Sequence, residues 1–178
     1  MHESATGLSA WEGFYVIVGT SGGALIGLQF VVMTLMAESR LRRQTGGLGA
    51  FGTPTVVHLT GALVVSAIMS APWPSLAPLS LALGSCGIGG LIYAIIVIRR
   101  AFRQTDYQPV WQDWLWYMAL PCTAYGTLLF DAIVLQGHNP ITLFLTAAVA
   151  LGLLVIGIHN AWDTVMHIVT AGREPTEN

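Results

Sequence analysis

Charged side chains are scarce in this 178-residue chain, and lysine is absent altogether. Only 9% of the residues are charged, against roughly 25% in an ordinary soluble domain. So few charges cannot solvate the surface of a compact globule, whereas 54% of the residues are hydrophobic. The scarcity of charge therefore excludes an ordinary soluble domain and predicts that a lipid bilayer covers much of the protein.

Cysteine is also rare, and the familiar catalytic motifs are missing. Cys86 and Cys122 both fall inside apolar runs, so we expect reduced packing residues rather than a disulfide framework or a zinc knuckle. The chain has no phosphate-binding loop, no dinucleotide fingerprint, no His-Glu-x-x-His and no nucleophile elbow. No basic patch with interleaved aromatics is laid out for nucleic acid. These absences disfavour an enzyme and predict no nucleic-acid partner.

Long apolar runs are what the chain does contain. Five of them cover residues of about 14–37, 55–73, 76–98, 114–136 and 141–168. About 20 apolar residues suffice for a helix to cross a bilayer, and these runs are too long and too uniformly apolar for the alternating strands of a barrel. The sequence therefore predicts an all-α, polytopic transmembrane helix bundle of about five spans, in a single domain over residues 1–178.

The positive side chains, all of them arginine, predict the orientation. Arg40, Arg42 and Arg43 lie between the first two runs, a second group of three lies between the third and fourth runs, and Arg173 follows the last run. Only an odd number of spans places all of these arginines on one side, and an excess of arginine marks the cytoplasmic side. We expect the N-terminus outside and the C-terminus in the cytoplasm.

A glycine zipper stands out in the first run. Gly19, Gly23 and Gly27 recur every four residues and share one helix face, which lets a second helix approach closely. That helix could belong to the same subunit or to a second copy in a homo-oligomer. Gln29 lies on another face, where it could hydrogen-bond across helices or line a pore.

Asp131 is the one carboxylate deep inside a predicted span. Placing such a group at a helix centre costs about 2.5–3.5 kcal/mol on insertion scales, and Thr127 precedes it by four residues on the same face. No Lys or Arg is predicted on the outer side to pair with it. The functional interpretation is proton or cation handling. The structural alternative is a solvated carboxylate near the interface or a buried hydrogen bond, with Thr127 as a candidate donor.

A second polar group lies toward the inner side of the predicted bundle. His159, Asp163 and His167 follow one another every four residues, Asn160 sits alongside, and His58 should lie at a similar depth. Imidazole and carboxylate ligate zinc, and histidine also ligates haem or pigments. The structural alternative is a helix that becomes polar as it leaves the membrane. Because the two groups should lie at opposite faces, we expect no single centre that combines them.

Two short stretches form a recognisable pattern. One is Trp11-x-x-Phe14-Tyr15-x-x-x-Gly19, which continues to Gly27-Leu28-x-Phe30-Val31, and the other is Asn160-Ala161-Trp162-Asp163. They resemble small multi-pass membrane proteins that are predicted in many bacterial genomes. The resemblance implies a bacterial cell (inner) membrane and no particular chemistry. It also implies that Asn160 and Asp163 matter beyond their contact with solvent.

Three functions compete at this level. The leading hypothesis is an oligomeric membrane protein that passes or senses an ion or small solute. The alternative is an accessory subunit of a larger respiratory or photosynthetic membrane complex, which would ligate a cofactor through His58 or His159. The third is an intramembrane enzyme that acts on a lipid, with His159 or Asp163 in a cleft open to the bilayer.

Overall fold

The structure, a computed structural model, describes residues 8–38, 48–103, 111–137 and 141–171. Within these ranges the side chains of 36–38, 48–52, 103 and 167–171 are not described. Every regular element in the described part of the chain is a helix. Five of these helical segments are long and apolar enough to cross a membrane. The all-α fold predicted from the apolar runs is therefore confirmed.

The spans follow the predicted runs closely. The first three are α2 (Glu12–Glu38), α3 (Leu48–Ser70) and α4 (Leu76–Arg103). The fourth span is composite and consists of α5 (Trp111–Trp114), the π-helix η2 (Leu115–Ala119), α6 (Leu120–Val134) and the 3₁₀ turn η3 (Leu135–Gly137). The fifth is α7 (Ile141–Ala171).

The second span departs from its predicted limits at both ends. It ends at Ser70 rather than near residue 73, because the prolines at 72 and 74 cannot continue a helix. The indole of Trp73 folds back instead and donates a hydrogen bond to the carbonyl of Ile68, at 2.5 Å. At the other end α3 begins at Leu48 and runs through Pro54. The proline removes one backbone hydrogen bond near the start of the helix without ending it.

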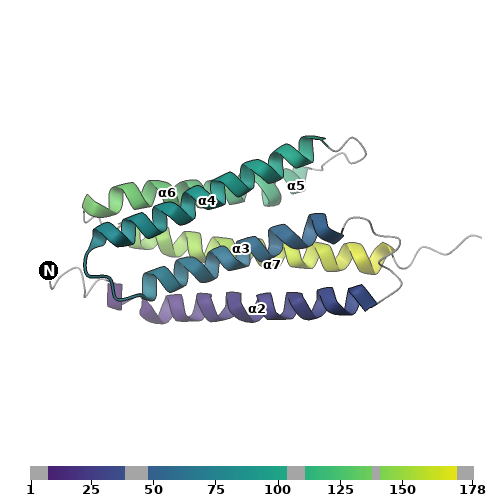
Figure 1. The fold of residues 1–178 in the computed structure, drawn as a ribbon, viewed down its shortest axis with the longest axis horizontal. Coiled ribbons are helices and arrows are strands. Elements are labelled where there is room, and N and C mark those ends of the chain that lie inside the picture. The colour runs from purple at the N-terminus through teal and green to yellow at the C-terminus, as the bar shows by residue number, and fades with distance from the viewer. Residues whose placement is uncertain (1–7, 39–47, 104–110, 138–140, 172–178) are drawn as a thin grey trace, which may run out of the picture.

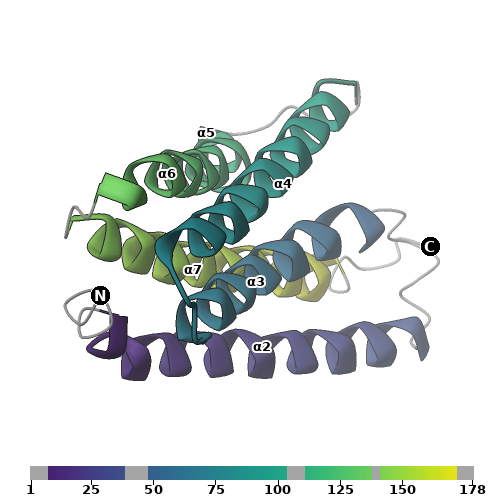
Figure 2. The same ribbon diagram turned by 60° about the vertical axis from the view of Figure 1, so that its left-hand side comes forward.

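The helices form two pairs and a single outer helix. Figure 1 shows α4 and α6 side by side on one side of α3 and α7, with α2 on the other side. Figure 2 shows the same order after rotation. We call the interface between the α4/α6 pair and the α3/α7 pair the seam. The end of the bundle at which α2 begins is called the N-terminal end, and the end at which α7 stops is called the C-terminal end.

Glycines set how closely the helices approach around Tyr125. A Cβ added at Gly87 of α4 would lie 2.9 Å from the backbone nitrogen of Leu129, and one at Gly90 would lie 2.1 Å from the ring of Tyr125. A Cβ at Gly61 of α3 would lie 2.9 Å from the Tyr125 hydroxyl. Tyr125 is therefore held between two glycines from opposite sides of the seam.

The outward faces of the spans carry apolar side chains. Ile17, Leu81 and Ile133 are each more than two-thirds exposed (67%, 72% and 71%), as expected of side chains that face lipid. Arg99 and Arg100 are exposed at the C-terminal end of α4. Other charged groups that carried the predicted orientation, namely Arg40, Arg42, Arg43 and Arg173, lie outside the described residues, as does the side chain of Arg103.

Candidate functional site

Asp131 lies in the last turn of α6, near the N-terminal end of the bundle, and it is fully buried (0% exposed). The hydroxyl of Thr146, on α7 across the seam, donates a hydrogen bond to Asp131 Oδ2. The other carboxyl oxygen, Oδ1, is buried without a hydrogen-bond partner. The donor is therefore Thr146 and not Thr127, the neighbour on its own helix that the spacing suggested. A solvated position near the interface is wrong for Asp131, because the side chain has no exposed surface.

Further buried hydroxyls lie at the same end of the bundle. Tyr15 of α2 is 1% exposed, its hydroxyl has no hydrogen-bond partner, and it lies within electrostatic range of Asp131. Ser66, in the last turns of α3, and Ser80, in the first turns of α4, are also buried toward this end of the bundle. Their hydroxyls likewise lack a hydrogen-bond partner. With Thr146, all five spans thus contribute a buried polar group close to the N-terminal end. We call this set the outer site.

His58 anchors a second polar group, which lies farther from the N-terminal end of the bundle than Asp131 does. It is 2% exposed on α3, and its Nδ1 lies 3.2 Å from the hydroxyl of Tyr125 on α6. The ring of Tyr93, from α4, lies 6.3 Å away between centroids. This hydrogen bond also crosses the seam. The sequence placed His58 among the candidates, but it gave no sign of Tyr125 as the partner.

Asn160 is the most unusual of the buried polar side chains. It is 0% exposed on α7, and neither its amide nitrogen nor its amide oxygen has a hydrogen-bond partner. The Thr164 hydroxyl donates to the backbone carbonyl of Asn160 at 2.8 Å and leaves the amide group untouched. Buried polar groups are nearly always hydrogen-bonded, so the unpartnered amide makes Asn160 a candidate to bind a ligand or a water.

The structure describes the side chains of two members of the predicted row of His159, Asp163 and His167. His159 stacks on Trp116 of η2, with ring centroids 3.7 Å apart and planes 5° apart. Asp163 is exposed, and the side chain of His167 lies outside the described residues. Among the described side chains, no group of three or more His, Cys, Asp or Glu could hold a metal ion. The zinc interpretation stays a prediction, because His167, one of its ligands, has a side chain outside the described residues.

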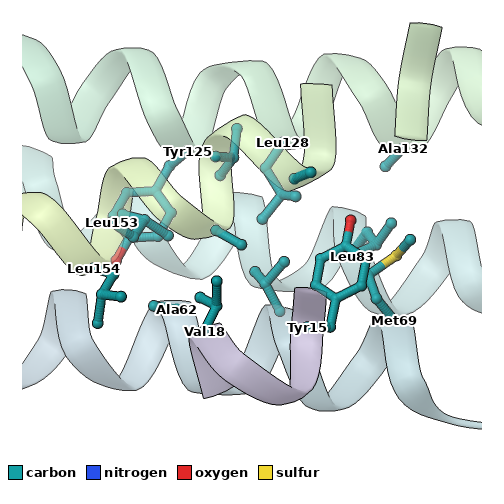
Figure 3. Close-up of a cluster of buried hydrophobic side chains, with 14 of the residues drawn as sticks. Tyr15, Val18, Ala62, Met69, Leu83, Tyr125, Leu128, Ala132, Leu153 and Leu154 are labelled. Atoms are coloured by element: carbon teal, nitrogen blue, oxygen red, sulfur yellow. The ribbon is translucent and has the colours of Figure 1, made fainter. Parts of the chain in front are cut away.

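An apolar layer separates the two polar groups. Leu128 of α6, Leu153 of α7 and Ala62 of α3 are all 0% exposed and belong to the hydrophobic core. In Figure 3, Leu128 lies between the rings of Tyr125 and Tyr15, and Leu153 lies next to Tyr125. Apolar side chains therefore lie between Asp131 and His58 among the described residues. The prediction of two sites at opposite membrane faces stays a prediction.

One face of α7 carries a polar, an apolar and a second polar side chain in the same order as the two groups and the layer between them. Thr146, Leu153 and Asn160 follow each other at seven-residue spacing, which keeps them on one side of a helix. Thr146 contacts the outer site through Asp131. Leu153 belongs to the apolar layer, close to the same glycine, Gly61, that the Tyr125 hydroxyl approaches. Asn160 then lies at the depth of the second group.

The three glycines of the zipper have different surroundings in the structure. A Cβ at Gly19 would lie 3.0 Å from the Cβ of Ser66, so Gly19 packs closely on α3. Gly23 and Gly27 have no neighbouring atom within 4 Å of such a Cβ. Packing within one subunit therefore accounts for Gly19 alone. Gln29 is partly exposed on α2.

The residues that sequence reasoning missed are mostly hydroxyls and aromatics. Thr146, Tyr15, Tyr125 and Trp116 look unremarkable inside apolar helices, where such residues usually only pack. The one signal that could have found Thr146 is its four-residue spacing from Thr142, because both threonines are buried on the same face of α7. Cys86 and Cys122 are free thiols, as predicted.

Comparison with known proteins found no protein-family model, no curated protein and no solved structure that matches the chain.

Proposed function

We propose that this membrane protein passes or senses a proton or another small cation through the polar groups along the seam. Asp131 is the first group to bind the ion. The observation that carries the proposal is the burial of Asp131 with one carboxyl oxygen unpartnered. Carboxylates inside transmembrane segments are costly and commonly mark ion or proton pathways.

The surroundings of Asp131 favour a bound ion over a structural role. A buried charge needs a partner of opposite sign, or it becomes neutral. The arginine side chains that the structure describes, Arg99 and Arg100, lie at the opposite end of the bundle. A proton or a bound cation would neutralise the carboxylate, and the hydroxyls of Thr146 and Tyr15 would supply oxygen contacts.

Orientation, location and assembly complete the proposal. The N-terminal end, with Asp131, faces the outside, and the C-terminal end faces the cytoplasm of a bacterial cell with its exposed Arg99 and Arg100. The protein acts as a homo-oligomer or within a larger membrane complex. The open space at Gly23 and Gly27 supports a contact with another helix at that face.

The test combines ion flux with direct observation of the carboxyl group. Wild type, Asp131→Asn and Asp163→Asn are reconstituted in liposomes, and proton and sodium fluxes are followed after a gradient is imposed. Infrared difference spectra at several pH values report whether a carboxyl group changes its protonation or its ligand. Asp163 is the control because it is exposed on α7.

We expect Asp131→Asn to lose both the flux and the infrared change, and Asp163→Asn to keep both. Wild-type behaviour of Asp131→Asn in both measurements would refute the assignment of Asp131. Native mass spectrometry in mild detergent tests the assembly separately, and detection of monomers alone would remove the oligomer from the proposal.

A further inference from the structure

The register of α3 and α7 brings His58 and Asn160 toward one another. A Cβ added at Gly157 would lie 3.3 Å from the backbone nitrogen of Leu59, so these two positions are level. His58 precedes Leu59 on α3, and Asn160 lies one turn beyond Gly157 on α7. Side chains tilt toward the N-terminus of their helix, and the two helices run in opposite directions. The imidazole and the amide therefore lean toward each other's level.

Two independent observations show that this region is built to hold something polar. The first is the buried hydrogen bond between His58 and Tyr125. The second is the fully buried amide of Asn160, with two donor hydrogens and an acceptor oxygen unused. A buried water typically makes about three hydrogen bonds to groups of this kind.

We infer that His58, Tyr125 and Asn160 form a second binding site, the inner site, which takes a proton and the water that carries it. The inference rests on the proposed function and deepens it, because it names the ion as a proton. The outer site offers oxygen atoms, which suit a proton or a metal cation alike. The inner site offers an imidazole, a phenol and one amide. An imidazole is a base for protons and a poor ligand for sodium or potassium.

Tyr125 allows His58 to hold the proton in either state. Neutral histidine carries one N–H, and in the tautomer with a bare Nδ1 the Tyr125 hydroxyl donates to that nitrogen. When a proton arrives from water, Nδ1 becomes a donor and the Tyr125 oxygen accepts. The proton leaves again to water held by Asn160. No bond other than these N–H and O–H bonds forms or breaks.

The other titratable groups near the inner site are a tyrosine and a cysteine of α4 and a histidine of α7. Tyr93 and Cys86 of α4 lie near Tyr125, and His159 of α7 is stacked on Trp116. Among the described side chains of α3, only His58 is titratable. A proton on His58 therefore has no fixed counter-charge beside it among these groups, which suits a transient carrier better than a permanent ion pair.

The experiment measures proton uptake into liposomes that contain a pH-sensitive dye, and sodium uptake in parallel. The variants are His58→Gln, Asn160→Leu and Tyr125→Phe, with Thr60→Val as the control because Thr60 is exposed on α3. We expect His58→Gln and Asn160→Leu to fall to the level of empty liposomes. Tyr125→Phe should keep some flux but change its dependence on pH. Protonated His58 then loses the Tyr125 oxygen that accepts a hydrogen bond from Nδ1. Thr60→Val should behave as wild type.

Wild-type proton uptake by His58→Gln would overturn the inner site, and so would sodium uptake without proton uptake by the wild type. The second result would leave the proposed function standing. Full flux in Asp131→Asn together with loss in His58→Gln would reject the outer assignment and keep the inner one. If His58→Gln does not fold, nitrogen-15 NMR of the wild-type histidine decides. A His58 ring that keeps one tautomer and one charge from about pH 4 to about pH 9 overturns the inference.

Discussion

Replacing Gly90 with alanine should damage the bundle more than its single methyl group suggests. The added Cβ would lie 2.1 Å from Tyr125 Cδ1 and 2.3 Å from its Cγ, far inside van der Waals contact. The overlap is with the part of the ring nearest its own backbone, so rotation of a flexible tip cannot relieve it. Either α4 moves away from α6, or the Tyr125 ring is displaced from His58.

The magnitude follows from three contributions. Overpacking a well-filled core costs about 1–3 kcal/mol. Breaking the buried His58–Tyr125 hydrogen bond adds about 1–3 kcal/mol. Against these, alanine favours the helix over glycine by about 1 kcal/mol. Because the first two contributions share one ring and do not add fully, we expect the free energy of unfolding to fall by about 2–4 kcal/mol.

Gly89→Ala is the matched control, because a Cβ there meets nothing within 4 Å on the exposed face of the same helix. That variant should be unchanged or more stable by up to about 1 kcal/mol. Both are compared with wild type by reversible unfolding in mixed micelles, followed by far-ultraviolet circular dichroism. If Gly90→Ala proves as stable as Gly89→Ala, the close approach of α4 to Tyr125 is refuted.

Three further predictions use the same unfolding assay. Gly19→Ala should lose about 1–3 kcal/mol, because its Cβ would lie 3.0 Å from a side-chain atom of α3, whereas Gly23→Ala should not destabilise the isolated subunit; the reverse order in dilute micelles that hold single subunits would contradict the packing of α2. Thr146→Val removes the donor to buried Asp131 and should cost about 1–3 kcal/mol, with a shifted infrared band of the carboxyl group; an unshifted band would mean that the hydrogen bond does not form. Leu153→Ala should cost about 2–5 kcal/mol and raise proton leakage through liposomes, because its cavity opens the apolar layer; a stable variant with no extra leakage would contradict the role of that layer.

The number and limits of the spans could be predicted because an apolar run of the right length is a signal contained in the local sequence. The errors lie at Pro54 and Ser70, where one proline is tolerated inside a helix and two others end it. The pairing of α4 with α6, and of α3 with α7, had no such signal. It depends on which glycine faces meet in space. The π-helical turn at Leu115–Ala119 likewise has no pattern in the residues that form it.

Part of the candidate site could be predicted from the sequence. Asp131, His58 and Asn160 could be found because polar side chains are conspicuous inside apolar runs. Their partners could not, because a hydrogen bond between helices depends on register and rotation about the helix axis. Thr146 and Tyr125 lie 15 and 67 residues from their partners, and each is an ordinary residue in its own helix. The glycine stripe shows the same limit, because spacing alone does not reveal which of its faces meets a neighbour.

One helix, α6, contributes to both hydrogen bonds across the seam. Asp131 bonds to Thr146 of α7, and Tyr125 bonds to His58 of α3, so α6 carries one half of each hydrogen bond. We expect a shift of α6 relative to α3 and α7 to rearrange both bonds. If the proposed ion binds, protonation of Asp131 or His58 changes which atoms donate and accept in these bonds. Occupancy at either site would then bias the same movement, and by linkage the movement would change the affinity of both sites.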